Sequence, residues 1–266
     1  MATYVFSDVH GHAAPLARAL ERTEPSEGDA YYCLGDMIDR GPDPLGVISL
    51  VRGLPGSHVL MGNHEDLMMS CMREPDNTLN AVNWGMNGGI VTSQALASLS
   101  EEEADEVVAW VAGLPLCAHV EVAGCSYALA HAGIDPVRVG EGPWDTPERL
   151  DELLAAQRPD DLMWIREDFW SRHTGLIDEK GEGPVVIAGH TPTPYLGMVT
   201  GEAADLGRDD EGRACLVRLG ADGSTGGVAD RWDIDAGAAG GHGFGRVLVL
   251  RLDDGREFYE DIGEDE

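Results

Sequence analysis

Positive charge is scarce in this sequence, which has 18 lysine and arginine residues against 48 aspartate and glutamate residues. Lys180 is the only lysine, and the other basic residues are arginines. The formal net charge of −30 disfavours binding to nucleic acids or anionic membranes, because both depend on basic patches. We therefore expect neither as a partner, and an anionic substrate would need local positive charge at its site.

Paired cysteines and long hydrophobic runs are also lacking. The five cysteines are scattered and form no CxxC pair, which argues against a disulfide framework and against a zinc knuckle. No apolar run approaches the roughly 20 residues that span a bilayer. Residues 1–8 lack the basic and apolar regions of a signal peptide. We therefore expect a cytoplasmic protein with reduced thiols.

What the sequence does contain is a regular alternation of short apolar runs and helical patterns. We expect strands at residues 3–7, 30–34, 57–61, 127–130 and 184–188. We expect helices at residues 15–22, 44–52, 65–72 and 146–157, and mainly helical structure over 79–112 with a break at 87–89. This alternation is typical of an α/β fold with parallel strands.

The last third of the sequence is richer in strands and in glycine. Residues 214–219 and 245–251 have the pattern of strands, and Gly- and Asp-rich segments lie between them. We interpret residues 200–231 as a surface insertion made of loops or a hairpin. Because no linker divides the chain, we expect a single domain over residues 1–266.

A side chain that can bind a metal follows the end of each predicted parallel strand. Each of these residues alone has an ordinary explanation as a helix cap, a solvated turn or a structural histidine. In open α/β sheets, however, the carboxyl ends of the strands form the ligand-binding crevice, so all of them could converge on one site. They are Asp8, His10, Asp36, Asn63, His131 and His190.

Taken together, these residues suit a pair of transition-metal ions. Imidazole mixed with carboxylate favours Mn²⁺, Fe²⁺ or Zn²⁺ over Ca²⁺ or Mg²⁺. Six ligands exceed one tetrahedral site but fit two ions that share a bridging carboxylate. Two such ions can clamp the attacking and leaving oxygens of a phosphoryl displacement. The set therefore predicts a dinuclear site, and we expect Mn²⁺ in it, with Fe or Zn as alternatives.

Five short motifs occur in a fixed order: DVHG at 8–11, GDMIDRG at 35–41, GNHE at 62–65, HAG at 131–133 and GHT at 189–191. Together they resemble the phosphoprotein phosphatase branch of the calcineurin-like metallophosphoesterases, which includes bacteriophage lambda phosphatase and bacterial serine/threonine phosphatases. The resemblance implies an α/β fold in which two mixed β-sheets pack face to face and are flanked by helices. It also implies a dinuclear site at the carboxyl ends of the strands.

The same resemblance implies a division of the metal ligands. Asp8, His10 and Asp36 would hold the first metal. Asp36 would bridge to the second metal, and its other ligands would be Asn63, His131 and His190.

The remaining motif residues would act on the substrate. The resemblance implies that His64 protonates the leaving oxygen and that Asp39 orients His64, which suits a poor alkoxide leaving group. Arg40 would bind phosphate oxygens, as would Asn63. A second arginine is expected downstream, and Arg166 is the candidate. An ion pair of Arg166 with its acidic neighbours, Glu167 or Asp168, is the alternative interpretation.

Two residues and one further segment receive no catalytic role. Asp43 receives no role beyond the turn in which it lies. Met61 stands where many relatives that act on phosphoproteins have arginine, which leaves the substrate open. Residues 232–238, WDIDAGA, resemble the late strand and turn beneath the family's site, and we interpret them as structural.

These observations predict a metal-dependent phosphomonoester hydrolase. The leading interpretation is a serine/threonine protein phosphatase in which a hydroxide bridging the two metals attacks phosphorus in line. The alternative is a symmetrical dinucleoside tetraphosphate hydrolase, and a more distant one is a non-catalytic metal-binding scaffold. The expected partner is thus a phosphorylated protein or a small phosphoester. The sequence does not decide the oligomeric state.

Overall fold

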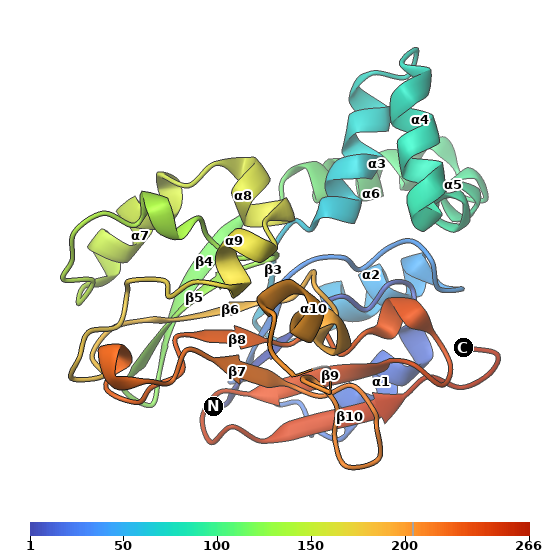
Figure 1. The fold of residues 1–266 in the computed structure, drawn as a ribbon. Helices are drawn as coiled ribbons and strands as arrows, with labels where there is room; N and C mark the ends of the chain where they lie inside the picture. Colours follow the sequence, from blue (N-terminus) through green and yellow to red (C-terminus); the bar gives the residue numbers. More distant parts are fainter. Residues whose placement is uncertain (204) are drawn as a thin grey trace.

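The computed structural model describes residues 1–203 and 205–266, and two five-stranded β-sheets form its centre (Figure 1). The first sheet has the order β10 (Glu257–Asp261), β9 (Arg246–Arg251), β1 (Thr3–Phe6), β2 (Ala30–Cys33) and β3 (Ser57–Val59). The second has the order β4 (Cys117–Val122), β5 (Cys125–Ala130), β6 (Val185–Ala188), β8 (Arg231–Asp233) and β7 (Val217–Leu219).

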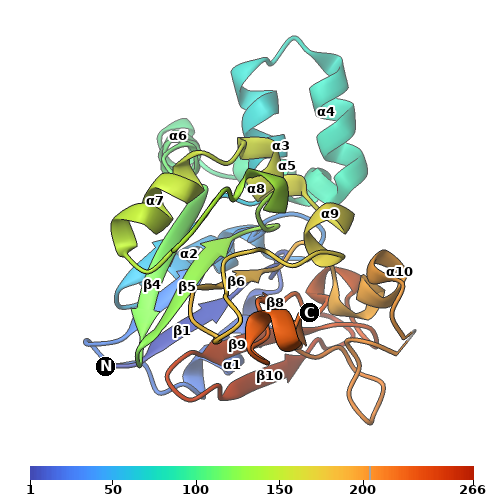
Figure 2. The same cartoon turned by 60° about the vertical axis from the view of Figure 1, so that its left-hand side comes forward.

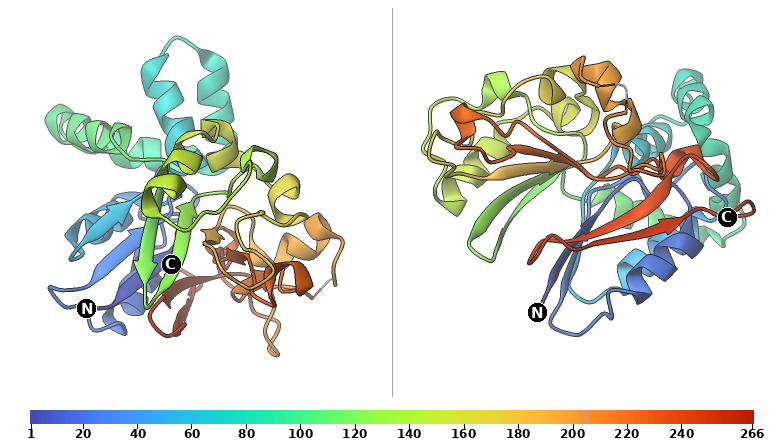
Figure 3. Two further views of the ribbon diagram at one scale, coloured as in Figure 1. Left: turned by 90° about the vertical axis from the view of Figure 1, so that its left-hand side faces the viewer. Right: turned by 60° about the horizontal axis from the view of Figure 1, so that its bottom comes forward.

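Both sheets are mixed, and each contains three adjacent parallel strands, most of which were predicted from the sequence. Strands β1, β2 and β3 run parallel, as do β5, β6 and β8, whereas β9, β10, β4 and β7 are antiparallel to their neighbours. Figure 3 shows the sheets as separate layers. The predicted fold of two mixed sheets flanked by helices is confirmed.

The two-residue period of the strands divides the core into layers. Val5 of β1 lies in the cluster between the sheets with Leu129 and Ile187, whereas Tyr4 and Phe6 face the opposite side and pack in the helix-covered cluster. All of these side chains are almost completely buried. Alternate residues of one strand therefore bury apolar surface on both faces, as expected for central strands of a sandwich covered by helices.

Helices cover the outer face of each sheet. Helices α1 (Ala13–Glu21) and α2 (Pro44–Gly53) contribute apolar residues to the core beside the first sheet. The second sheet is covered by α7 (Pro147–Ala155), α8 (Pro159–Trp164), α9 (Glu167–Trp170) and α10 (Leu196–Thr200). Asp43 caps α2 by accepting a hydrogen bond from the Gly46 N–H at 2.8 Å. No helix in residues 1–203 or 205–266 combines the length and apolar character needed to cross a membrane.

A helical arm, residues 63–97, projects beyond the edge of the two sheets, and its base packs in the core beside the first sheet (Figures 1 and 2). It comprises α3 (Asn63–Arg73), α4 (Thr78–Trp84), a π-helical turn (Gly85–Gly89) and α5 (Ile90–Ala97), and α6 (Glu101–Ala112) follows it. The break predicted at residues 87–89 falls in this π-helical turn, where Gly88 has a φ of 99°. Such a left-handed conformation favours glycine because it has no Cβ.

The segment 200–231 is not entirely loop. Its strand β7 pairs antiparallel with β8 and forms one edge of the second sheet. This strand is shorter than the predicted 214–219, because Ala214 instead forms an isolated bridge with Arg208. Part of the expected surface insertion thus belongs to the sandwich itself.

Candidate metal and phosphate site

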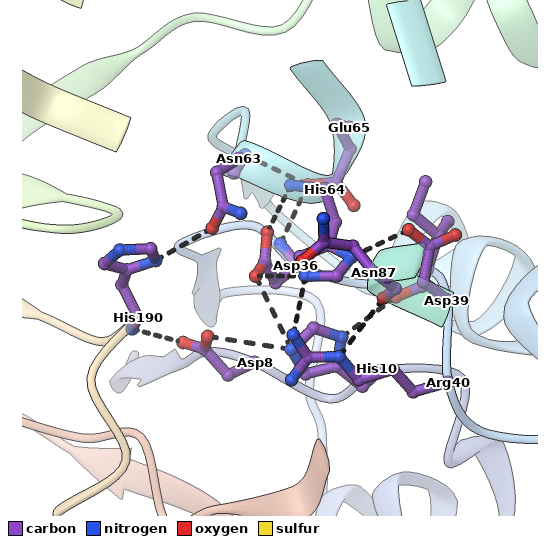
Figure 4. Close-up of polar contacts among 12 residues, drawn as sticks. Asp8, His10, Asp36, Asp39, Arg40, Asn63, His64, Glu65, Asn87 and His190 are labelled. Atoms are coloured by element: carbon purple, nitrogen blue, oxygen red, sulfur yellow. Dashed lines mark hydrogen bonds and ion pairs between the residues drawn. The ribbon is translucent and has the colours of Figure 1, made fainter. Parts of the chain in front are cut away.

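The loops that leave five strands meet at one edge of the sandwich. Asp8 and His10 follow β1, Asp36 follows β2, and the other three follow β3, β5 and β6. All six predicted metal-binding side chains are at least nine-tenths buried. The structure therefore brings together residues that lie up to 182 positions apart, and Figure 4 shows most of them around one centre.

The backbone at these strand ends is unusual. Eight non-glycine residues in the described part of the chain have positive φ, and six of them belong to this site: Asp8, His10, Asp36, Asp39, Arg40 and His190. Their φ values lie between 46° and 70°. Left-handed residues other than glycine cost roughly 1–2 kcal/mol each, and such strain is concentrated at functional sites. Here it turns consecutive side chains toward the same centre.

The Asp36 carboxylate lies at that centre. Its Oδ2 is 3.5 Å from His10 Nε2, 3.5 Å from His131 Nε2 and 3.9 Å from His64 Nε2. Its Oδ1 accepts a hydrogen bond from the His64 backbone N–H at 2.9 Å. Asp36 belongs to both groups of side chains that could hold a metal ion, one with His10 and His64 and the other with His131 and His190.

Three further donor atoms converge beside Asp36. Asn63 Oδ1 lies 2.9 Å from His131 Nε2 and 2.8 Å from His190 Nδ1, and the two ring nitrogens are 3.2 Å apart. The other nitrogen of two histidines is engaged with the backbone: the Leu34 carbonyl binds His131 Nδ1 at 3.0 Å, and the Ile38 carbonyl binds His10 Nδ1 at 3.0 Å. These bonds orient Nε2 of each ring toward Asp36, as outer partners of metal-binding histidines do.

Asp8 differs from the other predicted ligands. Its Oδ2 accepts hydrogen bonds from the Ser7 hydroxyl at 2.5 Å and from the His190 N–H at 3.0 Å. Its Oδ1 faces His10 Nε2 at 4.0 Å. One oxygen of Asp8 thus fixes the loop that follows β6, and the other is directed toward the shared centre.

Burial controls the electrostatics of the centre. It lowers the pKa of His131, and together with the charges of neighbouring histidines and arginines it lowers the pKa of His10 and His190 well below the usual range. Burial also raises the pKa of Asp36 well above its usual range. Neutral imidazoles have free lone pairs for metals, and a nearby cation would favour the ionised carboxylate. The donor set therefore fits two divalent ions.

His64 has a different environment from the ligand histidines. Its Nδ1 donates to Asp39 Oδ2 at 2.7 Å, and its Nε2 lies 3.0 Å from Arg40 Nη2. Burial would lower the pKa of His64, but the Asp36 charge and the hydrogen bond to Asp39 outweigh burial and raise it. A histidine held by a carboxylate beside a cluster of metal ligands is suited to transfer a proton.

Two arginines lie at the site. Arg40 is exposed at its surface, and its Nε donates to the Asn87 carbonyl at 3.4 Å. Arg166 Nη1 donates to the His190 carbonyl at 3.0 Å and to Thr191 Oγ1 at 3.1 Å, so it is fixed beside the centre. The alternative ion pair of Arg166 with an acidic neighbour is not among the described contacts, and Asp168 pairs with Arg172 instead. Met61 is a buried apolar residue.

The sequence analysis missed Glu65, which holds two motif loops together. Its fully buried carboxylate accepts hydrogen bonds from the backbone N–H groups of Asp36 at 2.8 Å, Met37 at 2.9 Å and Gly62 at 3.0 Å. Gly62 is required nearby, because a Cβ there would overlap the Asp36 carboxylate. A glutamate in the first turn after a strand was the only local signal of this role.

A family model described as "Calcineurin-like phosphoesterase" matches residues 1–225. The chain belongs to the calcineurin-like phosphoesterase family. The predicted superfamily is confirmed, whereas its serine/threonine phosphatase branch stays a prediction.

Similar proteins in this family carry two kinds of name. A symmetrical bis(5'-nucleosyl)-tetraphosphatase from Vibrio campbellii is 28% identical over 188 residues, which are 69% of this chain and 62% of that protein. The chain therefore spans less than two thirds of the length of this relative. Among solved structures, a candidate diadenosine tetraphosphatase has a TM-score of 0.57 at 16% identity and covers 98% of this chain and 94% of its own.

A second solved structure has the other name. A protein serine/threonine phosphatase from Saccharomyces cerevisiae has a TM-score of 0.54 at 14% identity, with 100% of this chain and 81% of its own covered. At these identities the two structures establish a shared fold, and the fold does not determine the substrate.

We expect Asp36→Asn to lower the metal content of this calcineurin-like phosphoesterase. An amide cannot bridge two cations as a carboxylate does, because one of its two positions is an NH₂ donor. Metal analysis after reconstitution with Mn²⁺ and gel filtration should find about two ions per wild-type chain and fewer in the variant. Two ions retained by Asp36→Asn would contradict the bridging position.

We expect Glu65→Gln to lower the free energy of unfolding by about 2–3 kcal/mol, because an NH₂ group would face backbone N–H donors in a buried site. Glu74→Gln is a matched control, since Glu74 is an exposed residue at the end of the same helix, α3. Urea denaturation of the metal-free proteins would compare the two changes. Equal stability of both variants would show that the Glu65 hydrogen bonds are not needed.

Proposed function

We propose that this protein is a metal-dependent hydrolase that cleaves P–O bonds. The observation that carries the proposal is the convergence of Asp36, Asn63 and three histidines beside the His64–Asp39 pair. Donors for two cations and a proton donor thus lie around one buried centre. The alternative of a non-catalytic scaffold would not need the proton donor.

These contacts support the ligand assignment that the family resemblance implies. Asp8, His10 and Asp36 would hold one ion, and Asp36, Asn63, His131 and His190 the second, with Mn²⁺ as the proposed metal and Fe or Zn as alternatives. When bound, two such ions would supply hydroxide near neutral pH and neutralise charge on the phosphoryl group.

The protein's own groups would then orient the phosphate and move a proton. Arg40 and Arg166 supply local positive charge in a strongly acidic chain, and together with Asn63 they would bind phosphate oxygens. His64 Nε2 would donate a proton to the leaving oxygen, while Asp39 holds Nδ1. In the structure Arg40 Nη2 lies at His64 Nε2, so the phosphate would separate these groups.

For the substrate, the relatives favour dinucleoside tetraphosphates, because the similar curated proteins carry that name. The resemblance of the five motifs to phosphoprotein phosphatases supports phosphoserine or phosphothreonine as the second candidate. The His64–Asp39 pair also favours this candidate, because a serine alkoxide is a poorer leaving group than a nucleoside diphosphate and gains more from a general acid.

The decisive experiment compares substrates on one preparation. The purified chain is stripped with EDTA, reloaded with Mn²⁺, and assayed with diadenosine tetraphosphate, a phosphoserine peptide and p-nitrophenyl phosphate. Release of ADP as the only nucleotide product would support symmetrical cleavage, and phosphate release from the peptide would support the phosphatase. Absence of turnover on all three substrates would reject a hydrolase.

We expect His64→Asn to retain the metals but to lower kcat by roughly 10²–10⁴-fold for a serine phosphoester, the usual contribution of a general acid. The loss should be much smaller for p-nitrophenyl phosphate, since nitrophenolate leaves without a proton. Steady-state kinetics and metal analysis would test this. Equal losses on both substrates would exclude the acid role.

A further inference from the structure

The Asp39 carboxylate is held by more groups than His64 alone. It is fully buried and accepts hydrogen bonds from Trp84 Nε1 at 3.1 Å to Oδ1 and 3.0 Å to Oδ2. Thr92 Oγ1 donates to Oδ1 at 2.6 Å and accepts from the Asp39 N–H at 2.9 Å. Both oxygens are thus fixed before the bond to His64 is counted, and none of these donors is among the motif residues.

Both donors come from the helical arm. Trp84 is the last residue of α4 and Thr92 lies in α5, so they flank the π-helical turn Gly85–Gly89. Their side chains are 6% and 1% exposed, which places the hydrogen bonds out of contact with bulk water. In such an environment an unpaired carboxylate oxygen would be costly, so the two donors confine Asp39 to one orientation.

The turn between the two donors also fixes Arg40. The Arg40 N–H donates to the Gly88 carbonyl at 3.3 Å, and its Nε donates to the Asn87 carbonyl at 3.4 Å. A Cβ on Gly88 would lie only 2.7 Å from Arg40 Cγ. The stretch from Trp84 to Thr92 therefore contacts both residues of the left-handed Asp39–Arg40 turn.

We propose that Trp84 and Thr92 are positioning residues for the His64–Asp39 pair. Neither residue is among the candidate metal ligands, and both act on the substrate only through Asp39. By fixing the carboxylate they would keep His64 in the orientation in which Nδ1–H faces Asp39 and Nε2 faces the leaving oxygen. This inference rests on the proposed function, because it requires that His64 acts as the general acid.

A purely structural role makes a different prediction. If Trp84 and Thr92 only attach the arm to the body, their loss would lower stability and affect all substrates equally. If they position the acid, removing either side chain would lower kcat most for substrates with poor leaving groups. In a variant that lacks His64, the same removal would no longer change kcat. A double-mutant comparison separates these cases, because residues that act through one group are not additive.

The experiment uses the 266-residue Mn²⁺-loaded chain with phenyl phosphate and p-nitrophenyl phosphate. Thr92→Val removes the hydroxyl at nearly constant volume, Thr92→Ser restores it, and Trp84→Phe removes the indole N–H. Thr78→Val and Trp110→Phe are matched controls, because Thr78 is exposed at the start of α4 and Trp110 lies in α6, under Arg52.

We expect Thr92→Val and Trp84→Phe each to lower kcat for phenyl phosphate by about 10-fold, with a smaller loss for p-nitrophenyl phosphate. KM and metal content should be unchanged in these variants. Thr92→Ser should have a kcat close to that of the wild type, and the two control variants should not change kcat on either ester. Added to His64→Asn, either change should have no further effect on kcat.

Two results would overturn the proposal. One is that Thr92→Val and Trp84→Phe lower kcat equally for both esters. The other is that either change lowers kcat by its full factor again when it is added to His64→Asn. If His64→Asn itself shows no dependence on the leaving group, the acid role fails first, and the positioning role fails with it. Should Trp84→Phe not fold, the Thr92 pair gives the same decision on its own.

Discussion

The site depends on left-handed backbone at the ends of β1, β2 and β6. At these strand ends Asp8, His10, Asp36 and His190 have positive φ, which a side chain adopts only where surrounding contacts enforce it. Those contacts are visible: Glu65 binds the N–H groups at Asp36 and Met37, and Asp8 binds the N–H of His190. The turns after β2 and β6 are thus each held by a carboxylate from a different segment, whereas the turn after β1 donates the N–H groups of Asp8 and His10 to the carbonyls of Gly35 and Asp36. Contacts from other segments of the sandwich thus hold the strained backbone at these strand ends, so that five loops can share one centre.

The same arrangement concentrates negative charge where water is excluded. Burial raises the pKa of Asp36, and burial together with nearby carboxylates raises the pKa of Asp233 and Asp235, all well above the usual range. Asp233 also has an oxygen without a partner in the described part of the chain. Isolated buried carboxylates are unfavourable unless a cation or donor compensates them. Divalent ions would therefore stabilise the folded chain as well as equip it for chemistry, and metal binding and folding should be coupled.

The sequence was sufficient for features that depend on local pattern. Strand–helix alternation indicated the parallel strands β1, β2, β3, β5 and β6, and the residue types at strand ends indicated the converging side chains. It was insufficient where the determining partner is remote. Strand β4 and strand β10 were not predicted, since each is a half-exposed strand paired along one side only. The roles of Glu65, Trp84 and Thr92 escaped because the Asp36, Met37 and Asp39 groups that they bind lie 28 to 53 residues away in sequence. The predicted alternative for Arg166, a local ion pair, failed for the same reason: its partners follow another strand.

The division between chemistry and substrate choice follows from where these contacts lie. The candidate metal ligands, His64 and the residues that hold its partner Asp39 all lie within residues 8–190. All of them are buried, so the parts of a substrate that stay in solvent can contact few of them. Proteins that share such a buried centre can therefore act on a nucleotide or on a phosphoprotein with the same central residues. The residues around the opening of the site then distinguish one substrate from another. On this chain the helical arm lies beside Arg40, and its residues 77–97 include no charged side chain in a chain of net charge −30. This segment adds no negative charge beside Arg40 and His64, so under the proposed function it would lower the repulsion that an anionic substrate meets on that side.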